Sequence, residues 1–250
     1  MSAFAQYLTS SAFLLPASIR ESAWSEHVPF AFWLVEVLRP RTLVELGTFH
    51  GMSFLAFCQS IKANATGTKA CAIDTWKGDP HAGTLPDHVY RDLHAIVSER
   101  YPTIATLIRS DFASAARPFA DGSVDLLHVD GFHTYEAVNS DFHAWQSKLS
   151  ENSIVLFHDT QVFDRDFGVY KFWQEIRAGR PSFEFEHGHG LGVVGFGTAF
   201  PPAIEALFTA GETDPAFVRT VFARLGRGVI DAIDSFRLRR VRRAIAAPIP

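Results

Sequence analysis

The sequence LLHVDGFHTYEAV, which runs from Leu126 to Val138, joins an apolar run to a helical pattern through a polar turn. The run is nearly continuous in aliphatic residues, as in a strand that is buried on both faces of a parallel sheet. It ends at Asp130, and apolar residues then recur every three or four positions from Tyr135 to Trp145. This stretch predicts a strand, a turn that carries an aspartate, and an amphipathic helix.

The same strand-and-helix unit recurs along the chain. Other apolar runs with polar ends are TLVELG from Thr42, ACAIDTW from Ala70, ATLIRSDF from Ala105 and SIVLFHDT from Ser153. Helical patterns separate these runs, and FEFEHG and LGVVGFG near the end read as an antiparallel pair around a glycine-rich turn. The alternation predicts an α/β fold with a doubly wound, mostly parallel sheet and a terminal antiparallel hairpin.

Composition and patterning also predict the domain organisation. We expect a helical extension or lid over residues 1–40, the main domain over 41–200, and a helical extension with a basic tail over 201–250. The tail crowds Arg237, Arg239, Arg240, Arg242 and Arg243 together, either as a solvated helix end or as a segment that docks on a partner or an anionic surface.

The chain reads as a globular protein, with 47% hydrophobic residues and a formal charge of −4 that gives no sign of a nucleic-acid partner. Cys58 and Cys71 lie in apolar segments, so we expect buried, reduced thiols rather than a disulfide. No apolar run approaches the roughly 18 residues of a membrane span, and the N-terminus lacks a basic leader region. We therefore expect a cytoplasmic protein without a membrane span.

Polar residues gather where the predicted strands end, and ligands of doubly wound sheets bind outside those ends. The residues are Glu45, Asp74, Asp111, Asp130, His158 and Asp159. Their distribution predicts a ligand site, although acidic residues in these places also cap helices.

The first strand leads into VELGTFHGMS, where Gly47 and Gly51 bracket a turn that lets a ligand approach the backbone and a helix N-terminus. Phe49 replaces the second glycine of a G-x-G-x-x-G turn, which disfavours a dinucleotide. Asp74 can accept hydrogen bonds from two ribose hydroxyls, and Trp76 either walls a flat ring or packs in the interior.

In order along the chain, VELGTFHG, AIDTW, RSDF and LLHVDG resemble the class I methyltransferases that use S-adenosylmethionine, over roughly Thr42 to Gly197. The segment HVDGFHTYEAVNSDFHAWQSKLSENSIVLFHDT looks like the branch that includes macrocin-type sugar O-methyltransferases and cephalosporin-hydroxylase-like proteins. The resemblance implies a seven-stranded Rossmann-like sheet, S-adenosylmethionine as cofactor, and methylation of an oxygen on a small acceptor such as a sugar.

The resemblance also implies roles for single residues. Glu45, Gly47 and Gly51 would shape the methionine and ribose end of the site, and Asp74 would hold the ribose. Ser110, Asp111 and Phe112 would flank the adenine, with Asp130 near the sulfonium and the acceptor. The full predicted cofactor set is Glu45, Gly47, Thr48, Gly51, Ser53, Asp74, Thr75, Trp76, Ser110, Asp111, Phe112 and Asp130.

Two hypotheses remain for the cluster of histidines and aspartates. In the first, Asp130, His158 and Asp159 bind a divalent cation; the resembled branch holds magnesium with three carboxylates, and a histidine among the ligands suits manganese or zinc better. In the second, His133 or His158 is the general base, oriented by a carboxylate such as Asp159. His128, inside the strand, is expected to be a buried, hydrogen-bonded residue.

Two other classes of function stay open on the sequence. One is a non-catalytic module that binds a cofactor or a partner such as a glycosyltransferase, because a fold does not fix function. The other is a nicotinamide-dependent oxidoreductase on a similar sheet. The identity of the acceptor and the oligomeric state, including a homo-oligomer, stay open as well.

Overall fold

The computed structural model describes residues 5–20 and 22–246, with side chains in the last helix described as far as Leu238. A seven-stranded sheet forms its centre, in the order β5-β2-β1-β6-β7-β9-β8. The strands are β1 (Thr42–Leu46), β2 (Lys69–Asp74), β5 (Ala105–Arg109), β6 (Val124–Val129), β7 (Leu149–His158), β8 (Ser182–Phe185) and β9 (Leu191–Phe196).

The five strands from β5 to β7 pair in parallel, and β9 runs antiparallel to both β7 and β8. The predicted doubly wound sheet with a terminal antiparallel hairpin is therefore confirmed. A second, small sheet pairs β3 (Gly78–Asp79) with β4 (Gly83–Thr84), in the loop after β2. The order of the large sheet reverses between β1 and β6, the place where such sheets bind ligands.

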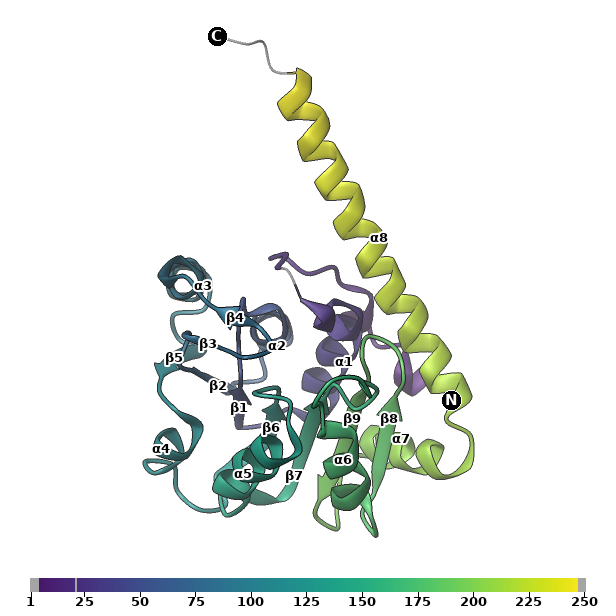
Figure 1. Ribbon diagram of the computed structural model, residues 1–250. Helices are drawn as coiled ribbons and strands as arrows, with labels where there is room; N and C mark the ends of the chain where they lie inside the picture. Colours follow the sequence, from purple (N-terminus) through teal and green to yellow (C-terminus); the bar gives the residue numbers. More distant parts are fainter. Residues whose placement is uncertain (1–4, 21, 247–250) are drawn as a thin grey trace.

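Helices cover both faces of the sheet (Figure 1). Successive strand residues point to opposite faces, so Ile154 and Leu156 of β7 join one core while Val155 and Phe157 join the other. The first core includes α1 (Val28–Leu38), α2 (Met52–Ala63), α3 (Asp87–Arg100), α7 (Pro202–Thr213) and α8 (Ala216–Ala246). The second includes α4 (Phe112–Ala116), α5 (Tyr135–Gln146) and α6 (Val169–Arg177).

The N-terminal segment is built into the first core. It folds as η1 (Ala5–Tyr7), η2 (Ser10–Phe13), η3 (Ala23–His27) and α1. The sequence VPFAFWLV is apolar on all sides, which is typical of a fully buried helix, and every residue from Val28 to Val35 is buried. Trp24, before this helix, is 1% exposed. Both cysteines, Cys58 and Cys71, are buried and unpaired as predicted.

The long C-terminal helix α8 packs against η3 and α1 along one stripe and then leaves the body (Figure 1). Val218, Phe222, Val229 and Ile233 form the buried stripe. Beyond it Leu238 is 60% exposed, and the side chains of the arginine-rich tail from Arg239 on lie outside the described part. Within the described residues, no helix is both long and apolar enough to cross a membrane.

Candidate functional site

A cavity of about 440 Å³ opens at the carboxyl ends of β1, β2, β6 and β7. Its volume falls within the range of about 300–1,000 Å³ that is usual for small-molecule sites. Most of the residues predicted from the sequence line it: Gly47, Thr48, Gly51, Ser53, Asp74, Thr75, Asp111, Phe112, Asp130, His133, His158 and Asp159. Glu45, Trp76 and Ser110 do not.

The glycine turn after β1 is packed tightly against the end of β6. Gly47 has φ +84°, and a Cβ atom there would lie 1.9 Å from the carbonyl oxygen of Asp130. Gly51 has the same φ and precedes the first residue of α2. Only glycine adopts these conformations without strain. The two glycines thus bring the N-terminus of α2, with its partial positive charge, to the wall of the cavity.

Asp74 holds this turn in place. Its Oδ2 accepts the backbone N–H groups of Thr48 and Phe49, each at 2.9 Å, and its Oδ1 accepts the N–H of Trp76 at 2.7 Å. The Trp76 indole donates to the Phe49 carbonyl at 3.0 Å, and Trp76 is 1% exposed. Trp76 therefore packs beneath the turn rather than against a ligand. A carboxylate has about four acceptor positions, so Asp74 keeps room for one more donor.

Glu45 lies behind the cavity rather than on its wall. It is 0% exposed, and its Oε2 lies 2.9 Å from Nδ1 of His128, its register partner on β6. The Trp24 indole donates to Nε2 of His128 at 3.1 Å. Because Nε2 accepts, the neutral ring carries its proton on Nδ1 and donates it to Glu45. Glu45 therefore does not line the cavity, contrary to the prediction that it contacts a ligand. His128 is buried and hydrogen-bonded as predicted.

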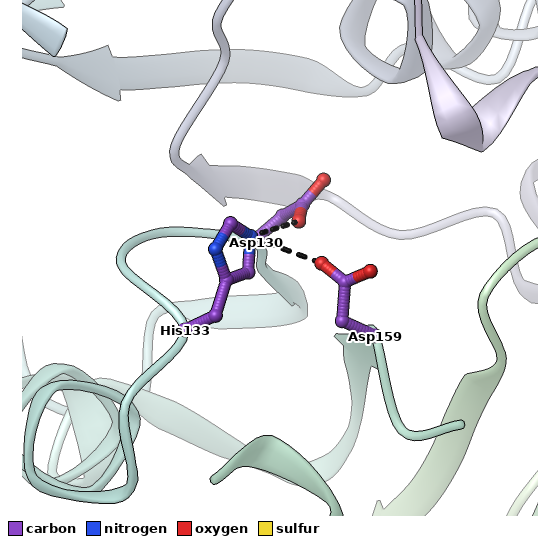
Figure 2. Close-up of side chains that lie close together, drawn as sticks. All are labelled: Asp130, His133 and Asp159. Carbon is purple, nitrogen blue, oxygen red and sulfur yellow. Dashed lines mark ion pairs between the residues drawn. The ribbon is translucent and has the colours of Figure 1, made fainter. Parts of the chain in front are cut away.

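Histidines and aspartates from β6, β7 and their loops converge on one side of the cavity. Asp130, His133 and Asp159 each offer one atom within 4.8 Å of the others (Figure 2). His133 Nε2 lies 3.0 Å from Asp159 Oδ2 and 3.8 Å from Asp130 Oδ1. His158 Nδ1 lies 3.3 Å from both of these oxygens, and His189 Nδ1 lies 3.1 Å from Asp159 Oδ1.

The backbone explains how the two consecutive residues His158 and Asp159 reach the same cavity. His158 is the last residue of β7, and Asp159 follows with φ +62°, in the left-handed region that aspartate tolerates better than most residues. The chain therefore leaves the pleat at this point. The sequence predicted that both side chains could turn toward the cleft, and both line the cavity.

The close contacts shift the charges of the cluster. Burial opposes a charge on His133, but the carboxylates of Asp130 and Asp159 raise its pKa to about 9. Burial likewise opposes a charge on His158, and the charges of Asp159 and Asp130 raise its pKa well above the usual value. The pKa values of both carboxyls are lowered, since the histidines outweigh their burial. The positive charges of the protonated imidazoles of His133 and His158 thus balance the negative charges of the two carboxylates.

The donor set fits a divalent cation of intermediate softness. His158 donates its Nε2 proton to the carbonyl of Gly188, 3.0 Å away, so its neutral ring would present the Nδ1 lone pair to the carboxylates. Two carboxylate oxygens and imidazole nitrogens form a mixed ligand set, which suits manganese or zinc better than magnesium. Metal ligands of this kind are usually held by an outer hydrogen bond like that of His158.

The sequence did not single out His81 or Phe167, which also line the cavity. The Phe167 ring stacks on His133 at 4.7 Å and on His81 at 4.6 Å, nearly parallel to both. These residues belong to the segments KGDPHAG and QVFDRDFG. A polar, glycine-containing loop after a strand was the only signal for them.

Comparisons with known proteins agree with this architecture. Residues 44–160, from β1 to just past β7, match a family model described as a methyltransferase domain. An uncharacterized protein of Sinorhizobium fredii, y4gI, is 47% identical over 176 residues, which make up 70% of this chain and 19% of that protein. The chain thus spans about a fifth of the length of that relative.

Solved structures share the fold at low sequence identity. A methyltransferase from Geobacter sulfurreducens aligns with a TM-score of 0.51 and 13% identity, over 73% of this chain and 81% of its own. A cofactor-bound protein from MTB aligns with a TM-score of 0.51 and 11% identity, over 79% and 89% of the two chains. Residues 44–160 thus resemble a methyltransferase domain, and the solved structures share the fold of the chain. The macrocin-type branch stays a prediction.

Proposed function

We propose that the protein transfers the methyl group of S-adenosylmethionine to an oxygen of a small acceptor, such as a sugar hydroxyl. The observation that carries the proposal is that two different sets of residues line two sides of the cavity. One side holds the glycine turn, Asp74 and Asp111, which suit the cofactor, and the other holds the cluster around Asp130 and Asp159. Such a cavity can hold a donor and an acceptor in line for a displacement.

The residues on the cofactor side of the cavity are already held in position by hydrogen bonds. The turn from Gly47 to Gly51 would receive the amino-acid end of the cofactor, and the remaining acceptor position of Asp74 would receive a ribose hydroxyl. Asp111 and Phe112 would flank the adenine. Asp111 is already fixed there, because its Oδ1 accepts the N–H of Ser114 at 2.8 Å and so begins α4. Pre-set groups of this kind lower the entropy lost on binding.

On the acceptor side, Asp130, Asp159 and the two histidines would hold a divalent cation. A bound cation would lower the pKa of the acceptor hydroxyl and orient it. The geometry favours this hypothesis over a histidine base. Both imidazoles lie within 3.0–3.3 Å of carboxylate oxygens, as N–H donors do. In that arrangement neither ring directs a lone pair at the hydroxyl group of a substrate, as a general base must.

Two measurements on the purified chain test the proposal. S-adenosylhomocysteine should raise the melting temperature, as any ligand of the folded state must, while NADH should not. With labelled S-adenosylmethionine, manganese and a panel of sugars and other hydroxyl compounds, label should pass to an acceptor. Binding of S-adenosylhomocysteine without transfer to any acceptor would instead favour a non-catalytic module, and stabilisation by NADH would favour an oxidoreductase.

A further inference from the structure

A hydrogen-bonded chain runs from the surface to the candidate cation site. Asp166 Oδ1 lies 2.6 Å from His81 Nε2, and His81 Nδ1 lies 3.2 Å from His133 Nδ1. On the other edge of its ring, His133 Nε2 lies 3.0 Å from Asp159 Oδ2. The Asp166 side chain is 63% exposed, whereas that of His81 is 9% exposed. We propose that His81, held by Asp166, is a positioning residue that fixes the tautomer of His133.

The donors and acceptors along this chain determine which nitrogen of each imidazole carries the proton. A carboxylate only accepts, so His81 carries a proton on Nε2 and donates it to Asp166. A neutral His81 then has its lone pair on Nδ1, and His133 must donate its own Nδ1 proton to it. The neutral His133 ring is left with its lone pair on Nε2, which faces Asp159 and Asp130. That is the form in which an imidazole binds a metal ion.

Local structure holds His81 where this requires. His81 lies in the turn between β3 and β4, and Asp79 Oδ1 accepts the backbone N–H groups of His81 and Ala82 at 2.7 and 2.8 Å. Gly78 has φ +85°, and a Cβ atom there would lie 1.8 Å from the carbonyl oxygen of Gly83. The hydrogen bonds to Asp79 thus define the backbone conformation at His81, and the sequence of this segment suits a tight turn.

The loop that carries Asp166 is fixed to the segment that carries His133. The N–H of Gly168 donates to the carbonyl of His133 at 2.8 Å. Phe167 covers the junction of the two imidazoles, because its ring is within 8° of parallel to His81 and within 6° of parallel to His133. The ring of His133 is thus held on one face by Phe167 and at Nδ1 by His81.

This inference rests on the divalent cation of the proposed function. It adds His81 as a residue that supports the ligand His133 from outside the cation site. Removal of a hydrogen bond behind a metal-binding histidine usually lowers metal affinity about 10- to 100-fold. We expect His81→Phe to lower the affinity for Mn²⁺ by that factor, because it keeps an aromatic ring beside Phe167 but removes the acceptor for His133. His81→Gln, which restores a side-chain acceptor, should recover part of the loss.

The test is calorimetric titration of Mn²⁺ into the wild-type protein, His81→Phe, His81→Gln and His88→Phe. His88 is an exposed histidine on α3 that does not line the cavity, so His88→Phe should bind like the wild type. In the zinc-loaded wild type, nitrogen NMR should find His133 bound through Nε2 with Nδ1 protonated. Unchanged Mn²⁺ affinity in folded His81→Phe, or coordination of His133 through Nδ1, would overturn the inference.

The binding of S-adenosylhomocysteine, measured on the same samples, separates this inference from the proposed function. If His81→Phe lost Mn²⁺ affinity and kept the cofactor affinity, both would stand. If the wild type bound the cofactor but no Mn²⁺, the positioning role and the cation hypothesis would both be refuted, while the methyltransferase assignment would stand.

Discussion

The carbonyl oxygen of Asp130 lies 1.9 Å from the point where a Cβ atom on Gly47 would stand. The end of β6 and the turn after β1 are therefore in direct contact, because Gly47 has no side chain to separate them. Gly47→Ala should force them apart and should abolish binding of S-adenosylhomocysteine. Strain at positive φ costs about 1–2 kcal/mol and overpacking costs about 1–3 kcal/mol, so we expect a total loss of about 2–5 kcal/mol in the free energy of unfolding.

Gly67→Ala is the matched control for this prediction. Gly67 also has a positive φ, +79°, but a Cβ atom there would meet nothing within 4 Å. Its substitution should cost only about 1–2 kcal/mol and leave cofactor affinity unchanged. Denaturant unfolding and calorimetry on both variants provide the measurements. Equal losses of stability would mean that the contact with Asp130 is not what requires glycine at position 47.

Asp74→Asn should weaken binding of S-adenosylhomocysteine at least tenfold, which is about 1.4 kcal/mol. The amide has only one oxygen, so at least one of the three backbone N–H groups around Asp74 would face an NH₂ group. The turn should lose about 1–3 kcal/mol of stability for the same reason. Calorimetry and denaturant unfolding measure the two effects separately. Asp234→Asn is the control, because Asp234 is an exposed residue on α8. Lower stability with full cofactor affinity would leave Asp74 only a structural role.

Removal of divalent cations should stop methyl transfer without a loss of cofactor affinity, since the cluster lies on the acceptor side of the cavity. We expect activity to fall after treatment with a chelator and to return with Mn²⁺, and more weakly with Mg²⁺ because the set includes nitrogen ligands. Asp159→Asn should reproduce the loss and resist rescue. Full activity in the presence of chelator would support the general-base hypothesis for His133 or His158 instead.

The strands and most of the cavity wall could be predicted because short-range patterns determine them. Apolar runs that end in a polar residue located Asp130 and Asp159 at neighbouring strand ends, and glycine spacing located the turn at Gly47. Glu45 shows the limit of this reasoning. It ends a strand in the same way, but its partner His128 lies 83 positions away on β6, and only the register of the sheet reveals that it is buried.

His81 and Asp166 could not be predicted for a related reason. They are 85 positions apart, in loops without periodicity, and their meeting depends on where the β3–β4 turn and the loop after β7 fold back. The sequence also did not reveal how deeply the N-terminal segment enters the core. Residues Val28 to Val35 of its helix α1 are buried in the core. Trp24, before this helix, hydrogen-bonds to His128 in the centre of the sheet.

Asp141 on α5 gives a prediction about stability that is independent of the proposed activity. Burial raises its pKa from 3.8 to about 7. The folded state therefore binds this proton more tightly than the unfolded state, so the stability that Asp141 contributes is complete below pH 4 and is lost as the pH rises to 7. A rise in pKa from 3.8 to about 7 would correspond to about 4 kcal/mol for a fully buried group. Solvent screening of this partly exposed residue reduces the expectation to about 1–2 kcal/mol.

Asp141→Asn removes the titrating group and keeps the shape of the side chain. We expect the variant to gain stability over the wild type by about 1–2 kcal/mol as the pH rises from 4 to 7, with a constant difference above pH 7. Denaturant unfolding of both proteins from pH 4 to pH 8.5 measures this difference, in which the contributions of groups distant from Asp141 cancel. A difference that did not change with pH would show that the pKa of Asp141 is not raised in the folded state and that water reaches its carboxyl group.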